Sequence, residues 1–135
     1  VTDKKFHSDI IKIRSYVNPS NEIRDNLLKE AHVNLLLSLD DSRNGFFEGF
    51  GQVVQEAGMF GTPSIVLATG GLPESVHDRE TGWVLSDLNS DTIQALVKKL
   101  DDDQYCKISA KCYDHTIASH GLDNWTKLFR ELLSP

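Results

Sequence analysis

Hydrophobic and polar positions follow two different periods along the chain. Short runs rich in β-branched and aliphatic residues predict strands over 10–16, 33–39, 64–68 and 83–85. Elsewhere apolar residues recur every three or four positions, the period of a helix buried on one face. This period predicts helices that start after Ser20, run from Val53 to Phe60, and cover 91–100, 103–119 and 124–133, with a short helix at Pro73-Glu74. The alternation predicts an α/β fold with a Rossmann-like, doubly wound parallel sheet.

The predicted topology also tells where a ligand would bind. Ligands of such sheets bind outside the carboxyl ends of the strands. Three loops leave those ends, at 15–19, 40–51 and 69–73. Any binding site is therefore expected to be built from these loops.

Composition narrows the function classes. The chain has 135 residues, which suits one domain, and a formal charge of −6, which disfavours a nucleic-acid binder. No apolar run approaches the ~20 residues that span a bilayer, and no signal peptide is seen, so a soluble, cytoplasmic protein is expected. Cys106 and Cys112 lack metal or redox spacing and are predicted to be structural thiols. The five histidines are scattered, so no metal site is predicted.

The segment from Glu48 to Ala57 carries the most chemical information. Gly49 and Gly51 allow close approach of a ligand to the backbone, and the helix that follows exposes unpaired amides at its start. Glu56 lies about 7.5 Å further along that helix, at 1.5 Å per residue. Two carboxylates this far apart cannot act on one atom, but they can hold two parts of an extended ligand that carries hydroxyl groups. Exposed surface positions would explain the same pair.

Four motifs in order resemble one enzyme family. They are Glu48-Gly-Phe-Gly-(four residues)-Glu-Ala, Gly61-Thr-Pro, Gly70-Gly-Leu-Pro-Glu and Glu80-Thr-Gly-Trp-Val-Leu. Together they resemble the C-terminal, donor-binding domain of retaining GT-B glycosyltransferases, closest to glycosyltransferase family 4, which includes relatives of glycogen and sucrose synthases. The resemblance extends from about Ile10 to Pro135, and its specific part lies between Val33 and Leu85.

The resemblance implies a role for each matching position. Glu48, the first Glu of the E-x7-E motif, would be catalytic and support positive charge at the anomeric carbon of the donor sugar. Glu56, the second, would accept the two ribose hydroxyls of the nucleotide. The remaining donor-binding positions would be the backbone amides of Phe50, Gly51, Gln52 and Val53, the loop at Gly70 and Gly71, and Tyr16 beside the base. A core aromatic would explain Tyr16 equally well, and a tight turn would explain the two glycines.

The implied reaction is retaining, metal-independent transfer of a sugar from a nucleotide diphosphate (UDP-, GDP- or ADP-linked) to a hydroxyl acceptor. No cofactor is implied besides this co-substrate. The resemblance places polysaccharide or lipid-linked glycan assembly as the context, with peripheral membrane association of the full-length enzyme as one option. Residues 1–135 would form the donor domain without its first strand and Gly-rich loop, and the acceptor-binding N-terminal domain would be missing. The isolated chain is therefore expected to be inactive.

Two other classes of protein stay open from sequence. A non-catalytic module could keep Glu48 and Glu56 for nucleotide or sugar binding alone. A phospho-acceptor receiver domain would use Asp40-Asp41 and Thr69 after buried strands, but it needs a Lys after a later strand, where this chain has Ser86-Asp87.

Overall fold

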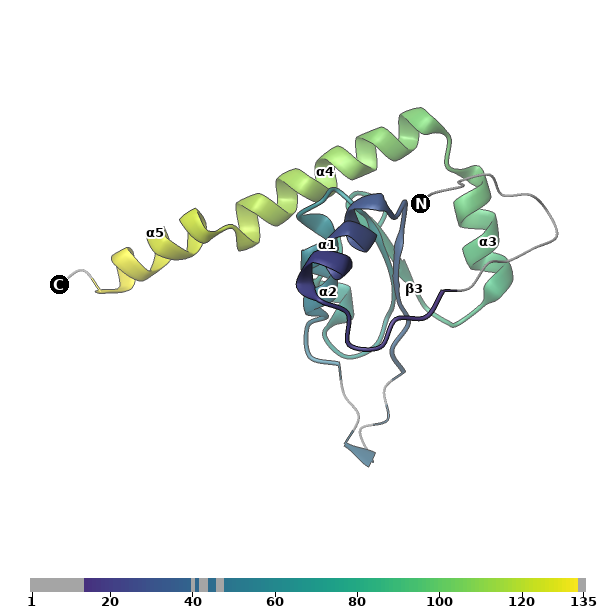
Figure 1. Ribbon diagram of the computed structural model, residues 1–135, viewed down its shortest axis with the longest axis horizontal. Helices are drawn as coiled ribbons and strands as arrows, with labels where there is room; N and C mark the ends of the chain where they lie inside the picture. The colour runs from purple at the N-terminus through teal and green to yellow at the C-terminus, as the bar shows by residue number, and fades with distance from the viewer. Residues whose placement is uncertain (1–13, 40, 42–43, 46–47, 134–135) are drawn as a thin grey trace.

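A three-stranded parallel sheet forms the centre of the protein. The computed structural model describes residues 14–39, 41, 44–45 and 48–133. The elements are, in order, α1 (Asn21–Glu30), β1 (Asn34–Leu36), α2 (Gln52–Gly58), β2 (Ser64–Leu67), the 3-10 turn η2 (Leu72–Glu74), β3 (Gly82–Leu85), α3 (Ser90–Lys99), α4 (Asp102–His120) and α5 (Leu122–Leu133). The strand order is β1-β2-β3, with Ile65 in register with Leu35 and Trp83. Figure 1 shows the helices around this sheet.

The two faces of the sheet are buried under different helices. On one face, Val66 packs with Val54 of α2 and with Leu72 and Val76 around η2. On the other face, a cluster of strand residues packs against α3 and the start of α4, and it consists of Ile65, Leu67, Trp83 and Leu85. Every residue of β2 is buried. The expected α/β fold with helices on both faces of a parallel sheet is therefore confirmed.

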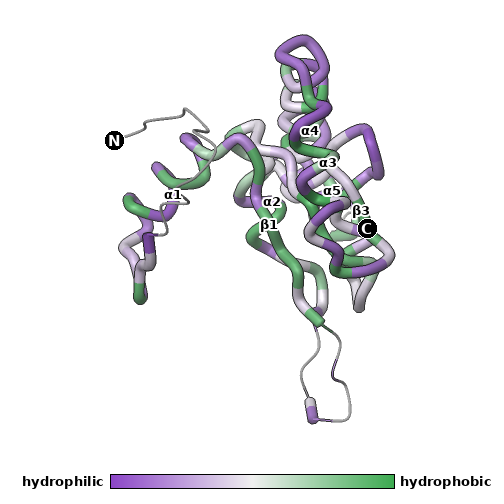
Figure 2. The backbone as a smooth tube through the Cα atoms, turned by 90° about the vertical axis from the view of Figure 1, so that its right-hand side faces the viewer, coloured by the Kyte–Doolittle hydropathy of each residue, from purple (hydrophilic) through white to green (hydrophobic). Residues whose placement is uncertain are grey.

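Local sequence signals explain where α1 and α2 begin and end. Ser20 caps α1 as predicted, since its hydroxyl oxygen accepts a hydrogen bond of 3.3 Å from the Ile23 amide. Helix α2 stops at Gly58, so Phe60 lies in the turn that follows rather than in the predicted helix. Gly61 follows with a φ of +71°, a conformation that glycine adopts without strain. Figure 2 shows the alternation of hydrophilic and hydrophobic residues along α1 and the hydrophobic run through β1.

Two predictions about strands were wrong in part. The run 33–39 forms a strand only over Asn34–Leu36, and Leu35 is 51% exposed rather than covered. The reason is that β1 lies at the edge of the described sheet, where Val33 and Leu37 pack against the buried strand cluster but Leu35 stays half exposed. Of the predicted strand 10–16, residues 10–13 lie outside the described part, and 14–16 are exposed and form no strand.

Helix α4 packs beside α2. Gly58 lets the two helices approach, because a Cβ there would overlap the Thr116 side chain. The Cys112 thiol lies 3.8 Å from the Thr62 carbonyl oxygen, and burial raises the pKa of this thiol to about 11. Cys112 is thus a buried, unreactive thiol, as predicted, whereas Cys106 is exposed; neither forms a disulfide.

Helix α5 continues outward from α4, away from the sheet (Figure 1). Its apolar side chains lie on one face of the helix and stay exposed, and they are Leu122, Trp125, Leu128, Phe129, Leu132 and Leu133. Within the described part of the chain, none of the helices combines the length and the hydrophobicity that crossing a membrane requires.

Candidate functional site

The loops that leave the carboxyl ends of β1 and β2 are tied to each other. The Thr69 hydroxyl donates a hydrogen bond of 2.7 Å to the Ser38 carbonyl oxygen. The Gly71 amide donates one of 3.1 Å to the backbone carbonyl oxygen of Glu48. The first bond joins the two loops where they leave the sheet, and the second holds the backbone of Glu48 against the Gly70-Gly71 loop, at the edge where a ligand was expected.

Two glycines permit this close contact. At Gly71, a Cβ atom would overlap the carbonyl oxygen of Gly49, so any larger residue would push the two loops apart. Gly51 has a φ of +72°, and a Cβ there would lie 2.6 Å from Leu72 Cδ2. The loop before α2 can therefore pack on the core only with glycine at position 51.

Glu48 lies beside the start of α2. Its Oε1 accepts a hydrogen bond of 3.2 Å from the Gly51 amide, and the residue is partly buried. The positive end of a helix stabilises a carboxylate in this place. The carboxylate of Glu48 is thus kept at one point of the site by its own loop.

Glu56 lies in the second turn of α2 and has a cationic partner. Its Oε2 is 3.5 Å from Nε of Arg24, which comes from α1, and its side chain is 36% exposed. The same guanidinium donates to Asp25 Oδ1, at 3.3 Å from Nε and 3.1 Å from Nη2. Glu56 is thus held in place yet still reachable from solvent.

The other predicted donor-binding residues are spread around this edge. Tyr16 is 45% exposed, which makes the alternative of a core aromatic wrong. Phe50 packs its ring edge-on against His120 of α4, with 5.5 Å between centroids. Gln52 is exposed and Val53 half-buried in the first turn of α2, and Gly70 has a φ of +53°. The roles of all these positions stay predictions.

Sequence reasoning missed Arg24. It lies four residues before the buried Leu28, so both occupy the face of α1 that packs toward α2. A cation placed one turn before a core leucine, in a helix with a clear N-cap, could have been recognised from the sequence as facing a neighbouring element. Only the packing of α1 beside α2 identifies Glu56 as its partner, and this contact is absent from any sequence pattern.

A histidine pair between the loop before β3 and α4 was also missed. The rings of His77 and His115 lie 4.1 Å apart between centroids. Burial, and then the nearby His77 and His120, lower the pKa of His115 from its ordinary value of 6.5. The described residues hold no group of three or more His, Cys, Asp or Glu side chains arranged to bind a metal ion.

This pair predicts a pH dependence of stability. Because the unfolded chain binds a proton at His115 more readily than the folded chain, stability is complete above pH 6.5 and falls as the pH drops below it. Urea unfolding at pH 7.5 and 5.5 should show a lower midpoint at pH 5.5, and His115→Gln should reduce this difference. His32→Gln is the control, because its ring contacts Tyr105 instead of a histidine. Equal pH dependence in wild type and His115→Gln would contradict the prediction.

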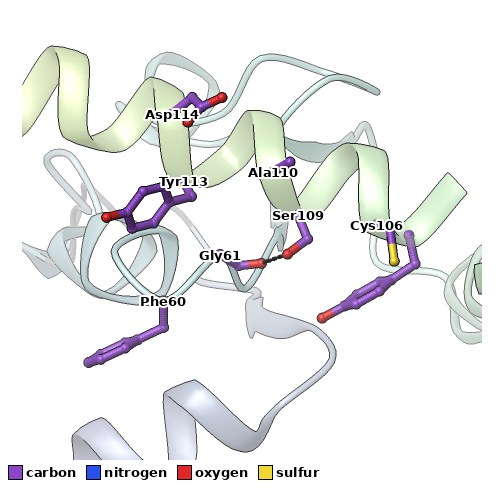
Figure 3. A pocket seen from close by; sticks show the side chains of 8 residues that line it. Phe60, Gly61, Cys106, Ser109, Ala110, Tyr113 and Asp114 are labelled. Atoms are coloured by element: carbon purple, nitrogen blue, oxygen red, sulfur yellow. Dashed lines mark hydrogen bonds between the residues drawn. The ribbon is translucent and has the colours of Figure 1, made fainter. Parts of the chain in front are cut away.

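A groove between α4 and the turn after α2 lies elsewhere (Figure 3). The Ser109 hydroxyl donates a 2.7 Å hydrogen bond to the Gly61 carbonyl oxygen at its floor. Gly61 precedes β2, so the groove borders the amino edge of the sheet. None of the predicted site residues lines it.

Comparison with known proteins agrees with the fold and defines the family. The family model described as "Glycosyl transferases group 1" matches residues 8–117. A stretch of 57 residues is 46% identical to the D-inositol 3-phosphate glycosyltransferase of Corynebacterium aurimucosum, covering 42% of this chain and 14% of that protein.

Solved structures show the same fold. The HepE protein of Anabaena, crystallised with UDP and glucose, superposes with a TM-score of 0.65 at 18% identity, over 79% of this chain and 28% of HepE. The C-terminal domain of a glycosyl transferase group 1 family protein (LpcC) from Francisella tularensis gives 0.62 at 24% identity, over 79% of this chain and 51% of that structure.

The chain thus spans between a seventh and about half of the length of these proteins. The family model covers most of the chain, including Glu48, Glu56 and the Gly70-Gly71 loop. This match makes the receiver-domain alternative wrong. The chain belongs to the glycosyl transferases group 1 family.

Proposed function

We propose that this chain supplies the donor side of a retaining, metal-independent glycosyltransferase of the family 4 type, with a nucleotide-diphosphate sugar as its ligand. The observation that carries the proposal is the placement of Glu48 and Glu56. Glu48 lies in a loop that Gly71 holds at the carboxyl edge of the parallel sheet, and Glu56 lies in the second turn of α2, the helix into which that loop leads. The neighbouring HepE structures, crystallised with UDP or UDP-glucose, support a nucleotide sugar as the ligand class.

Each carboxylate has a separate task in this proposal. Glu56 accepts hydrogen bonds from the two ribose hydroxyls. Glu48, half-buried beside the start of α2, contacts the donor sugar and stabilises positive charge that develops at the anomeric carbon. The acceptor hydroxyl attacks on the face from which the diphosphate leaves. The amides of residues 50–53 and the Gly70-Gly71 loop border the departing diphosphate.

Other parts of the enzyme complete the reaction. Acceptor binding, and the basic groups that balance the diphosphate, come from an N-terminal domain and from segments beyond the motifs found here. The chain alone therefore binds a donor but does not turn it over. We place the enzyme in the cytoplasm, at the membrane face if its acceptor is lipid-linked.

Donor binding tests this proposal directly. In saturation-transfer NMR with UDP-, GDP- and ADP-glucose, one nucleotide should show transfer to its ribose and base. Glu56→Ala should raise its Kd at least tenfold, because each lost hydrogen bond to a charged group is worth about 1.5–3 kcal/mol. Glu22→Ala, an exposed acid on α1, is the control and should bind like wild type.

Turnover separates the two carboxylates. In the enzyme that contains both halves, Glu48→Ala should mainly lower kcat, whereas Glu56→Ala should mainly raise the KM for the donor. The sugar in the product should keep the anomeric configuration of the donor. Wild-type kinetics in both variants would contradict the assignment. Donor binding without turnover by that enzyme would instead favour a non-catalytic binding module.

A further inference from the structure

The ion pair between α1 and α2 suggests a role for a residue that no motif includes. We propose that Arg24 is a positioning residue that orients Glu56 toward the ribose hydroxyls and thereby sets a preference for ribonucleotides over 2′-deoxyribonucleotides. This inference rests on the proposed function, in which Glu56 binds the ribose. Arg24 itself acts through Glu56 and does not touch the ligand.

The arrangement of the two helices makes this contact part of the fold. Helix α1 packs beside α2, and it makes one polar contact with α2 and another with Thr62, which follows α2. Arg24, in the first half of α1, pairs with Glu56, with 3.5 Å between Nε and Oε2. One turn later, the Leu28 carbonyl oxygen accepts a 2.6 Å hydrogen bond from the buried hydroxyl of Thr62, which follows α2. The hydrogen bond between Leu28 and Thr62 fixes the position of α1 along α2. Arg24 therefore lies opposite Glu56.

Asp25, the next residue of α1, also holds the guanidinium of Arg24. Arg24 donates to Asp25 Oδ1 from both Nε and Nη2. The hydrogen bonds to Asp25 fix the plane of the guanidinium, and Glu56 approaches the same Nε as an ion-pair partner at 3.5 Å. The positive charge of Arg24 balances part of the negative charge of Glu56, and the ion pair restricts the side-chain rotamers of Glu56. Among the described residues, Arg24 is the cation that pairs with Glu56.

A carboxylate whose orientation is fixed binds the two ribose hydroxyls more strongly than a carboxylate that rotates freely. The two oxygens of a carboxylate offer about four lone-pair positions, so pairing with Arg24 at Oε2 leaves acceptors for two hydroxyls. The vicinal hydroxyls of ribose sit in a fixed geometry, and both bonds form only if the carboxylate has the matching orientation. Loss of Arg24 lets Glu56 rotate, so that the second hydroxyl, at the 2′ position, adds less to binding.

The test compares UDP with 2′-deoxy-UDP on the full chain by NMR titration, and uses GDP and ADP with their deoxy forms if UDP does not bind. Wild type should prefer the ribonucleotide about tenfold, the effect of one hydrogen bond to a charged acceptor. Arg24→Ala should reduce this preference to about threefold, as expected for a half-exposed ion pair. Arg24→Lys should restore part of it. Lys29→Ala, a basic residue in the last turn of the same helix, is the matched control.

A double-mutant cycle distinguishes positioning from direct contact. In a Glu56→Gln background, Arg24→Ala should change the Kd for UDP less than twofold. An undiminished effect in that background, or a wild-type preference for ribose in Arg24→Ala, would overturn the inference and leave the donor site standing. Failure of the wild-type chain to bind any of the three nucleotides, or binding without preference for ribose, would instead contradict the proposed role of Glu56.

Discussion

Replacing Gly71 with alanine is expected to destabilise the chain by about 2 kcal/mol and to weaken donor binding on the order of tenfold. A Cβ atom at this position overlaps the carbonyl oxygen of Gly49, which is backbone and cannot rotate away. Relief of the overlap must separate the two loops and lengthen the 3.1 Å hydrogen bond from the Gly71 amide to the Glu48 carbonyl oxygen. Glu48 then moves relative to the rest of the site.

Gly49→Ala is the matched control for this prediction. A Cβ at Gly49 meets no atom within 4 Å, although Gly49 lies on the other side of the same contact. Urea unfolding and titration with the nucleotide sugar that wild type binds should show a large effect for Gly71→Ala and less than 0.5 kcal/mol for Gly49→Ala. Equal stability of the two variants would show that the loops adapt, and that the close approach does not hold Glu48.

Much of the fold follows from local sequence. The run 64–68, apolar from Ile65 onward, predicted a buried strand, and β2 is buried at every residue. Ser20 predicted the start of α1 because its hydroxyl satisfies an amide that the helix leaves unpaired. These signals work because they depend on neighbouring residues alone.

Other features depend on where an element lies in the fold. The run 33–39 is also mostly apolar, yet only three residues pair as a strand and Leu35 is half exposed, because β1 lies at the edge of the described sheet. The length of α4 was close to the prediction, but its path beside α2 depends on the contact between Gly58 and Thr116. No periodicity encodes such a contact.

The candidate site, too, has features that follow from local sequence and features that depend on the fold. The spacing of Glu48 and Glu56 and the surrounding glycines could be found in the sequence, since these residues are close in the chain. The hydrogen bond from Gly71 to Glu48 and the ion pair from Arg24 to Glu56 join residues 23 and 32 positions apart. They required the fold, which brings the loops of adjacent parallel strands to one edge and places α1 beside α2.

Replacing Ile65 with alanine is expected to cost about 3 kcal/mol of unfolding free energy, the largest effect predicted for this chain. Ile65 is fully buried in the central strand and packs with Trp83 against the helices of that face. Leu35→Ala removes a similar side chain from the position that pairs with Ile65 on β1, where half of the side chain is already in water, and should cost less than about 1 kcal/mol.

Urea unfolding should show a lower midpoint for Ile65→Ala at a nearly unchanged m-value, since unfolding exposes almost the same surface in the variant and in wild type. A comparable loss in Leu35→Ala would mean that another part of the protein covers β1, so that the described edge of the sheet is not an edge in solution. The difference between the two variants therefore measures how completely these helices enclose the sheet whose loops carry Glu48 and Gly71.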